Sequence, residues 1–266
     1  MNERPSKERR STLAPATEAL AAELPWLPRT AVATLVRARD ALTSAFGERL
    51  LGAYLVGPAL HPTRFDRGRR PEVVAIVTDA SGADVAALGD AAKSAMRAGV
   101  RIQVVSEWDL SRSADAFALQ IADWKAHHAT LVGDETRLAQ VPVRADHVRL
   151  DAERRLRLLQ RRLRELVLDA QLGSTPSAEA PDAAARGLDE LLLLARHVLP
   201  MLGEPAPEDE AARLAAFVRA GEGEPEDLLA AYARFHDGER IQRPLALLDA
   251  LGPVAARLVD RVDALE

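Results

Sequence analysis

The segment LLGAYLVGPALHPTRFDRGRRPEVVAIV, residues 50–77, gives the clearest indication of the fold. It contains two short apolar runs, Leu50–Val56 and Val73–Val77. Apolar runs of this length, bounded by turn residues, predict buried strands. Gly57 and Pro58 end the first run, and a polar loop rich in arginine leads to the second. The segment therefore predicts two core strands joined by a long polar loop.

The sequence on either side of this segment adds helices and a third strand. A helical pattern begins after Pro28 and ends near Gly47, before the first predicted strand. Asp84–Arg97 repeats its apolar residues at helical spacing, and Val100–Val105 is a further short apolar run that predicts a strand. Ser106, with an acid three residues later, has the pattern of a helix cap. The order strand, strand, helix, strand is typical of a layered α/β unit.

The second half of the chain has only helical patterns. From Asp151 onward, apolar residues step by three and four along one helix face, namely Ala152, Leu156, Leu159, Leu163, Leu166 and Ala170. Residues 173–187 are rich in Ala, Ser, Pro and Gly, and predict a linker. Further helices are expected over residues 188–202, 208–220, 225–237 and 244–264. Gly252-Pro253 is expected to break or kink the last of them.

Composition excludes several classes of protein. Of the 266 residues, 48% are hydrophobic and 28% are charged, so most of the chain can bury enough apolar surface to fold. The absence of cysteine excludes disulfides, thiolate nucleophiles and cysteine metal sites. No apolar stretch approaches the roughly 18 residues that span a bilayer, and the N-terminal residues lack the apolar core of a signal peptide. We therefore expect a cytoplasmic protein with no membrane contact.

Charge is distributed unevenly within a net charge of −5. Residues 144–165 carry eight arginines and four acids, whereas residues 204–239 carry ten acids and three arginines. The basic helix could lie along nucleic acid, but its leucine stripe has to be buried, and aromatic residues for base stacking make up only 4% of the chain. We therefore interpret the arginines as a solvated helix face and expect no nucleic-acid partner.

An apolar strand that ends in Gly-Pro, followed by a long loop and a second apolar strand, resembles the start of the nucleotidyltransferase fold. The segment VRIQVVSEWDLSRSADAFALQIADWKAHHATLVGDE and the helix DAERRLRLLQRRLREL after it are similar to a divergent bacterial branch of the minimal nucleotidyltransferase superfamily, whose members have HEPN-like helical partners. The resemblance covers roughly residues 30–170. It implies an α+β fold, with a small mixed sheet and flanking helices followed by an all-α helical bundle. The implied parts are a disordered tail over 1–12, a nucleotidyltransferase-like domain over 13–148 and a helical domain over 149–266.

The residues that carry catalysis in this superfamily are changed here. Active members hold two divalent metals with an Asp-x-Asp pair that opens the second strand and a third acid in a later strand. The Asp-x-Asp positions fall on Pro71 and Val73. A shift of one residue offers Glu72 with Val74, which is still one carboxylate, and the third acid would fall near Gln103. The resemblance therefore implies that two-metal catalysis is lost.

The remaining site residues lie near Gly57. Active members use a Gly-Ser turn that approaches phosphate, and here Pro58 replaces the serine and removes both a hydroxyl and a backbone donor. The resemblance implies nucleotide binding at Gly57 and, through charge-assisted bonds, at arginines of the loop. The candidates are Arg64, Arg69 and Arg70, with Glu72 as a remnant of the catalytic acids. If the alignment is displaced, Asp66, Glu72 and Asp79 instead rearrange to hold a metal.

Other catalytic sites are not indicated. Asp123 and His127 lie four residues apart on a predicted helix, but the HExxH spacing is absent, and we interpret them as structural. No Gly-x-Ser-x-Gly elbow, Gly-x-x-x-x-Gly-Lys loop or Gly-x-Gly-x-x-Gly turn occurs. A HEPN ribonuclease would resemble the motif of an arginine followed after four to six residues by a histidine, and this chain lacks it.

Three functions remain open from the sequence. The first is a degenerate, catalytically impaired nucleotidyltransferase-like protein that acts by binding a nucleotide or a protein, with a homodimer or protein partner meeting its helical domain. The second is an active, metal-dependent nucleotidyltransferase that uses Mg²⁺ and a nucleoside triphosphate to modify a protein or small molecule. The third is an antitoxin-like or structural interaction protein whose acidic residues 204–239 meet a basic partner.

Overall fold

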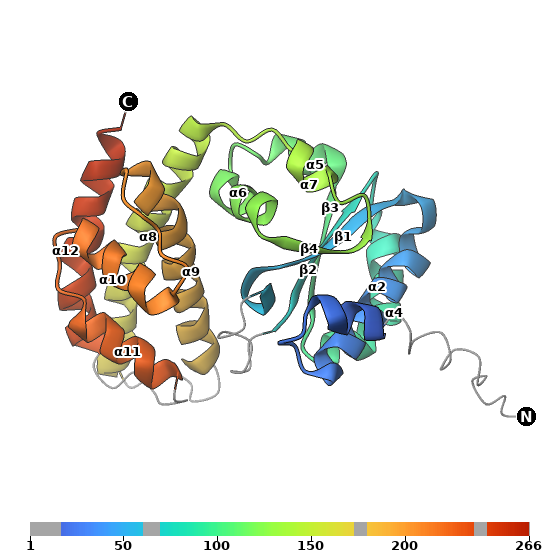
Figure 1. Ribbon diagram of the computed structural model, residues 1–266, viewed down its shortest axis with the longest axis horizontal. Coiled ribbons are helices and arrows are strands. Elements are labelled where there is room, and N and C mark those ends of the chain that lie inside the picture. Colours follow the sequence, from blue (N-terminus) through green and yellow to red (C-terminus); the bar gives the residue numbers. More distant parts are fainter. Residues whose placement is uncertain (1–16, 61–69, 173–179, 237–243, 266) are drawn as a thin grey trace, which may run out of the picture. The chain divides into compact units, whose positions relative to one another are not determined.

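The computed structural model describes residues 17–60, 70–172, 180–236 and 244–265 (Figure 1). The chain forms two compact units. The first unit comprises the chain up to Ala114 together with Asp123–Pro142. The second comprises Asp115–Ala122 and everything from Val143 onward. The chain therefore enters the second unit twice.

The first unit is built on a four-stranded mixed sheet with the strand order β3-β2-β1-β4. β1 (Leu50–Val56) pairs antiparallel with β2 (Glu72–Val77) and with β4 (His128–Gly133). β2 pairs parallel with β3 (Arg101–Ser106), and α4 (Gly82–Arg97) makes the crossover between them. The small mixed sheet confirms the expected fold class. The three predicted strands are present within one residue of their expected bounds, whereas β4 was not predicted.

Helices α2 (Arg29–Phe46) and α4 cover one face of this sheet (Figure 1). Alternate residues of the strands point into the core that these helices close. The buried strand residues in this core are Ala53, Leu55, Val73, Ala75, Val77 and Leu131. The residues between them, among them Tyr54, Val56 and Val74, are buried on the opposite face.

Short helical elements complete the first unit. Two 3₁₀ turns, Gly47–Arg49 and Gly57–Leu60, flank β1. The expected helix start at Ser106 is confirmed, because the Ser106 side chain accepts a hydrogen bond from the backbone N–H of Asp109 at the start of α5 (Glu107–Arg112). The other short helices are α6 (Ala118–Ala126), whose first residues belong to the second unit, and α7 (Arg137–Gln140).

The second unit is a bundle of helices. It contains α8 (Ala145–Leu172), α9 (Ala180–Met201), α10 (Glu210–Ala220), α11 (Glu226–His236) and α12 (Pro244–Asp263). The predicted leucine stripe of α8 is confirmed as a packing face, since Ala152, Leu156, Leu159 and Leu163 are buried in the core of the bundle. In the described part of the chain, no helix is long and apolar enough to cross a membrane.

Two boundaries in this unit differ from expectation. α9 begins at Ala180, inside the segment predicted as a linker, of which residues 173–179 lie outside the described residues. The alanines of residues 180–186 favour helix, and this outweighs their loop-like composition. Of the expected break or kink at Gly252-Pro253, the break is wrong, because α12 continues through Pro253. Burial of Leu251, Val254 and Ala255 on both sides of the proline holds the helix together.

A buried carboxylate connects α8 with the start of α6. The side chain of Asp151 is 1% exposed and accepts a hydrogen bond of 3.1 Å from the backbone N–H of Leu119. This N–H lies in the first turn of α6, where amides have no partner within their own helix. Arg154 and Arg155 donate to the same carboxylate at 2.7 and 3.2 Å, and Arg155 also binds Glu190 of α9 at 3.0 Å. Asp151 therefore caps the N-terminus of α6, and its charge is neutralised by arginines of α8, the helix to which it belongs.

Candidate functional site

The candidate site lies at one edge of the sheet, where β1 ends and β2 and β3 begin. Val56, the last residue of β1, pairs with Glu72, the first residue of β2, and Glu72 pairs in turn with Arg101 at the start of β3. Gly57 follows directly and has a φ of +72°, a conformation that glycine adopts readily. A Cβ atom at Gly57 would lie only 3.4 Å from Oε2 of Glu72. The predicted pair of site residues, Gly57 and Glu72, is therefore brought together.

The carboxylate of Glu72 contacts two side chains of β3. Gln103 donates a hydrogen bond from Nε2 to Oε1 of Glu72 at 2.5 Å. A guanidinium nitrogen of Arg101 lies 3.6 Å from the same oxygen. The Glu72 side chain is 16% exposed, so these two contacts replace much of its hydration. The carboxylate is thus satisfied by an amide and a cation from its own chain.

Strand register shows which residues face this site. Val73 is buried against α2 and α4 on the opposite face, so the positions with the site are Glu72 and Val74. Val74 pairs with Gln103 in the parallel ladder, which places both on the face of Glu72. The first alignment, on Pro71 and Val73, is therefore one residue out of register. In the correct register, the three positions carry one carboxylate, one valine and one amide.

The arginines expected to bind phosphate are placed only in part. Arg70 is exposed, and its Cγ atom would lie 3.6 Å from a Cβ at Gly99, which lies just before β3. Its stem therefore lies against Gly99, just before the start of β3. Arg64 and Arg69 lie outside the described residues, as does Asp66.

Asp79 does not take part in this site. It follows the far end of β2, and at about 3.3 Å per residue its Cα lies roughly 20 Å from that of Glu72. Its carboxylate instead binds Arg49 at 2.9 Å. Arg49 also donates to Asp84, and this contact holds the pKa of Asp84 well below its usual range. Glu72 and Asp79 therefore cannot share a metal, which corrects the expectation that both act in one metal site.

His128 completes the edge of the sheet and was not identified from the sequence. It is the first residue of β4 and pairs with Val56, so it lies in the same cross-strand row as Glu72 and Arg101. Its Nδ1 donates to the backbone oxygen of Trp124 at 2.8 Å, which leaves Nε2 as the acceptor of the neutral ring. The sequence pattern gave no signal of the strand that His128 begins.

The aromatic ring of Tyr54 packs against the ring of His128. The two rings meet edge to face with centroids 5.5 Å apart, and the Tyr54 hydroxyl donates to the backbone oxygen of Asp134. Burial, with a smaller contribution from the Asp134 carboxylate, raises the pKa of Tyr54 to about 12. The hydroxyl is therefore a neutral donor over the whole physiological range of pH.

The raised pKa of Tyr54 predicts a loss of stability in alkali. Below about pH 10, the hydroxyl is protonated in both folded and unfolded chains and its stabilising contribution is complete. This contribution is lost as pH rises from about 10 towards 12. Because the chain has only two tyrosines, the Tyr232→Phe variant isolates Tyr54, and its tyrosinate absorbance should appear near pH 12 in the native protein. A midpoint near 10 without unfolding would contradict the prediction.

The described residues do not fit a two-metal centre. Among them, no group of three or more His, Asp or Glu side chains is placed to hold a metal ion. Nδ1 of His127 lies 3.4 Å from the carboxylate of Asp123, and the backbone N–H of His127 donates to the backbone oxygen of Asp123 at 2.8 Å. An amide at position 103 and a valine at position 74 supply no charge to offset that of a divalent cation.

Comparisons with known proteins bear on the fold. No protein-family model matches the sequence, and no curated protein matches it significantly. Among solved structures, the chain is similar to a spectinomycin adenyltransferase from Enterococcus faecialis, determined with ATP and spectinomycin. The identity is 11% and the TM-score is 0.52, over 86% of this chain and 98% of that chain. The fold is nucleotidyltransferase-like.

The nucleotidyltransferase-like fold extends beyond the sheet. Each of the two units contains about half of the chain, so a match over 86% includes residues of both. The helical bundle therefore belongs to the similarity, as the sequence resemblance implied. At 11% identity, the similarity shows the fold alone.

Proposed function

We propose that this protein is a nucleotidyltransferase-like protein that has lost two-metal catalysis and binds a nucleoside triphosphate, or a ligand with a similar polyphosphate, at the sheet edge beside Gly57. The hydrogen bond from Gln103 to Glu72 carries this proposal. A magnesium site needs anionic oxygens that point at the ion, but here an amide donates its hydrogen to the single carboxylate. The arrangement satisfies Glu72 without a metal ion, because Gln103 and Arg101 supply its partners.

Fixed positive charge supports binding of phosphate at the same edge. The Arg101 side chain is 53% exposed next to Glu72, and Arg70 is exposed with its stem against Gly99. Guanidinium groups bind phosphate oxygens through charge-assisted hydrogen bonds. Gly57 has no side chain, so a ligand can approach the backbone between these arginines and His128. The similar adenyltransferase was determined with ATP, which makes ATP the first ligand to test.

Binding of ATP should not depend on magnesium. We expect isothermal titration to give similar dissociation constants for ATP in Mg²⁺ and in EDTA. Arg101→Gln should weaken binding about tenfold or more, because it removes one charged hydrogen-bond donor. Arg97→Gln is the matched control, since Arg97 is an exposed arginine at the end of α4 and should leave affinity unchanged. Binding that needs Mg²⁺, or no binding at all, would contradict the proposal.

Transfer of a nucleotide should be absent. With labelled ATP or CTP and either Mg²⁺ or Mn²⁺, we expect no incorporation into protein or into an aminocyclitol acceptor such as spectinomycin. The rival function is an active transferase with displaced carboxylates. Metal-dependent transfer that is lost in Glu72→Gln would support that rival and overturn the proposed loss of catalysis.

A further inference from the structure

The side chain of His128 lies on the same face of the sheet as that of Glu72. His128 pairs with Val56 between β4 and β1, and Val56 pairs with Glu72 between β1 and β2. Residues directly opposite each other on neighbouring strands point to the same face of a sheet. The ring contact with Tyr54, two residues before Val56 on β1, agrees with this direction. His128 therefore belongs to the face that carries the proposed ligand site.

Of the two basic side chains in this row, His128 is nearer to Gly57 than Arg101 is. His128 lies one strand spacing, about 5 Å, from Val56, the residue before Gly57. Arg101 lies two spacings, about 10 Å, from Val56, and the strand of Glu72 lies between them. A phosphate that approaches the backbone at Gly57 therefore meets His128 before it meets Arg101.

The backbone turn beside His128 is held in place by the first unit. The indole Nε1 of Trp26 donates to the backbone oxygen of Ala59 at 3.0 Å, within the turn Gly57–Leu60. The same turn also contacts β4, the strand that His128 begins. Because the turn is anchored at this point, little of it has to be ordered when a ligand binds.

Nε2 of His128 is available to a ligand. Nδ1 lies 2.8 Å from the backbone oxygen of Trp124, and because a carbonyl oxygen only accepts, Nδ1 carries a hydrogen. Within the described residues, Nε2 makes no hydrogen bond or ion pair. It is also not one of the buried polar atoms that lack a partner, so solvent reaches it. In the neutral ring Nε2 is an acceptor, whereas in the protonated ring it is a charged donor.

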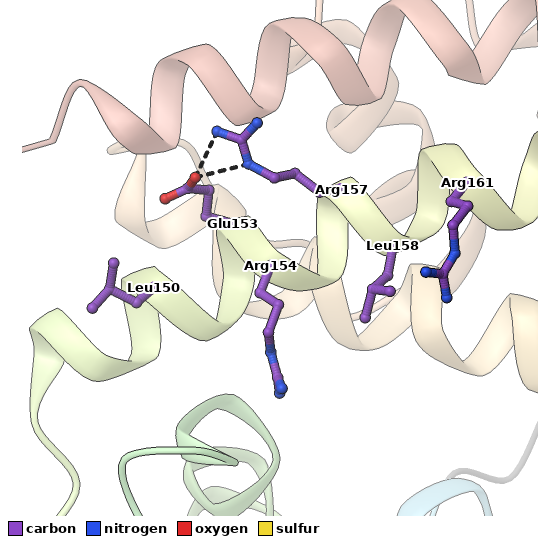
Figure 2. Close-up of a pocket in the computed structure, with 6 residues that line it drawn as sticks. All are labelled: Leu150, Glu153, Arg154, Arg157, Leu158 and Arg161. Carbon is purple, nitrogen blue, oxygen red and sulfur yellow. Dashed lines mark hydrogen bonds and ion pairs between the residues drawn. The ribbon is translucent and has the colours of Figure 1, made fainter.

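The arginines of α8 differ from His128 in this respect. They line a hollow of about 440 Å³, and Figure 2 shows one of them, Arg157, turned to Glu153 of the same helix. Each arginine of the hollow has a carboxylate partner, and the pairs are Arg154 with Asp151, Arg157 with Glu153, and Arg161 with Glu165. A phosphate would have to displace these carboxylates, whereas at Nε2 of His128 it displaces only water.

We propose that His128 is a second phosphate contact of the sheet-edge site, and that its Nε2–H binds the ligand only when the ring is protonated. This inference rests on the proposed function. Three strand spacings, about 14 Å, separate the backbones of His128 and Arg101. A chain of phosphates, as in a nucleoside triphosphate, therefore fits these two cations better than a single phosphate does.

Other titratable groups lie on the elements around His128. They are Tyr54 on β1, Glu72 on β2, and Asp123, Lys125 and His127 near the end of α6, while the turn Gly57–Leu60 has none. Burial raises the pKa of Tyr54 to about 12, so its hydroxyl stays neutral in the range from about pH 5 to 8 where histidines titrate. Carboxylates and lysines ordinarily keep their charge in most of this range. His127 is therefore the neighbour whose titration has to be separated from that of His128.

Isothermal titration with ATP in EDTA, at about pH 6 and about pH 8, tests the role of His128 in the full-length protein. His128→Asn places an amide donor near the position of Nδ1, so it can keep the bond to Trp124 while it removes Nε2. The wild type should bind ATP about tenfold more tightly than this variant at pH 6 and about equally at pH 8. The terminal phosphate also takes up a proton in this range, but comparison at the same pH cancels that effect.

Two further variants complete the test. His127→Asn is the matched control and should bind ATP like the wild type at both values of pH. His128→Lys supplies a permanent charge and should bind ATP about tenfold more tightly than the wild type at pH 8. Circular dichroism checks that each variant folds, and His128→Gln, which also removes the charge, replaces the asparagine variant should that one unfold.

The possible failures of the two proposals can be told apart. Equal ATP affinities of the wild type and His128→Asn at pH 6 would overturn the role of His128 and leave the proposed function in place. A difference that is equally large at pH 8 would show that protonation is not required, and would also overturn the inference. Absence of ATP binding by the wild type at both values of pH would overturn the proposed function, and this inference with it.

Discussion

Replacing Asp151 by alanine should destabilise the helical unit by about 3–5 kcal/mol, the cost of removing one partner from a buried charge network. The change leaves the N–H of Leu119 without its acceptor and leaves Arg155 with only Glu190. Asp151→Asn should cost less, because the amide oxygen can still accept from Leu119.

Two spectroscopic signals separate the effect on each unit. The three tryptophans, Trp26, Trp108 and Trp124, all lie in the first unit, so their fluorescence follows that unit during denaturation. Circular dichroism at the helical band is dominated by α8–α12. We expect Asp151→Ala to shift the dichroism midpoint more than the fluorescence midpoint. Asp146→Ala, which removes an exposed ion pair with Arg144 at the start of α8, should cost under about 1 kcal/mol. Equal costs for the two variants would show that Asp151 is not a structural cap.

Replacing Gln103 by glutamate should create a metal site beside Glu72. The new carboxylate would lie within hydrogen-bond distance of Glu72, since the present amide is 2.5 Å from it. Two adjacent carboxylates repel each other, and a divalent cation relieves that repulsion. We expect Gln103→Glu to bind Mn²⁺ and to gain about 2.7 kcal/mol of stability at a hundredfold excess over the dissociation constant. The wild type should show no such gain.

A swapped variant provides the matched control for this experiment. Glu72→Gln combined with Gln103→Glu keeps one carboxylate and one amide at the same two positions. It should resemble the wild type and show no gain of stability in Mn²⁺. A gain in the swapped variant, or in the wild type, would mean that a single carboxylate is enough to bind the metal there, and the proposed loss of metal chemistry would fail.

The sequence predicted the parts of this fold that depend on periodicity. β1 and β2 are apolar runs between turn residues, and the buried leucine stripe of α8 follows the helical repeat. β4 was missed because its six residues, HATLVG, directly follow a helix and contain a histidine and a threonine among the apolar positions. Its strand character comes from pairing with β1, which is a contact distant in sequence.

Prediction of the site from the sequence had a similar limit. The sequence identified Gly57 and Glu72, but alternation along one strand could not decide whether residue 72 or residue 73 faces the site. Pairing with β3 decides it, because Glu72 lies against Arg101 and Gln103 while Val73 lies in the core. Asp79 is close to Glu72 in the sequence, but β2 lies between them, so Asp79 lies beyond the opposite end of that strand. His128 needed β4 and was therefore not identified.

The chain enters the helical unit twice, first at Asp115–Ala122 and again from Val143 onward. This limits how the two units can be exchanged between proteins during evolution. A gene segment that begins at Val143 encodes all of α8–α12, but it omits Leu119, which is fully buried in the bundle core and whose N–H satisfies Asp151. Recombination that moved this segment as a contiguous block would transfer a helical bundle that lacks the side chain of Leu119 in its core. The Asp151 carboxylate would then lack the N–H of Leu119 as its hydrogen-bond donor. The two units should therefore be inherited together.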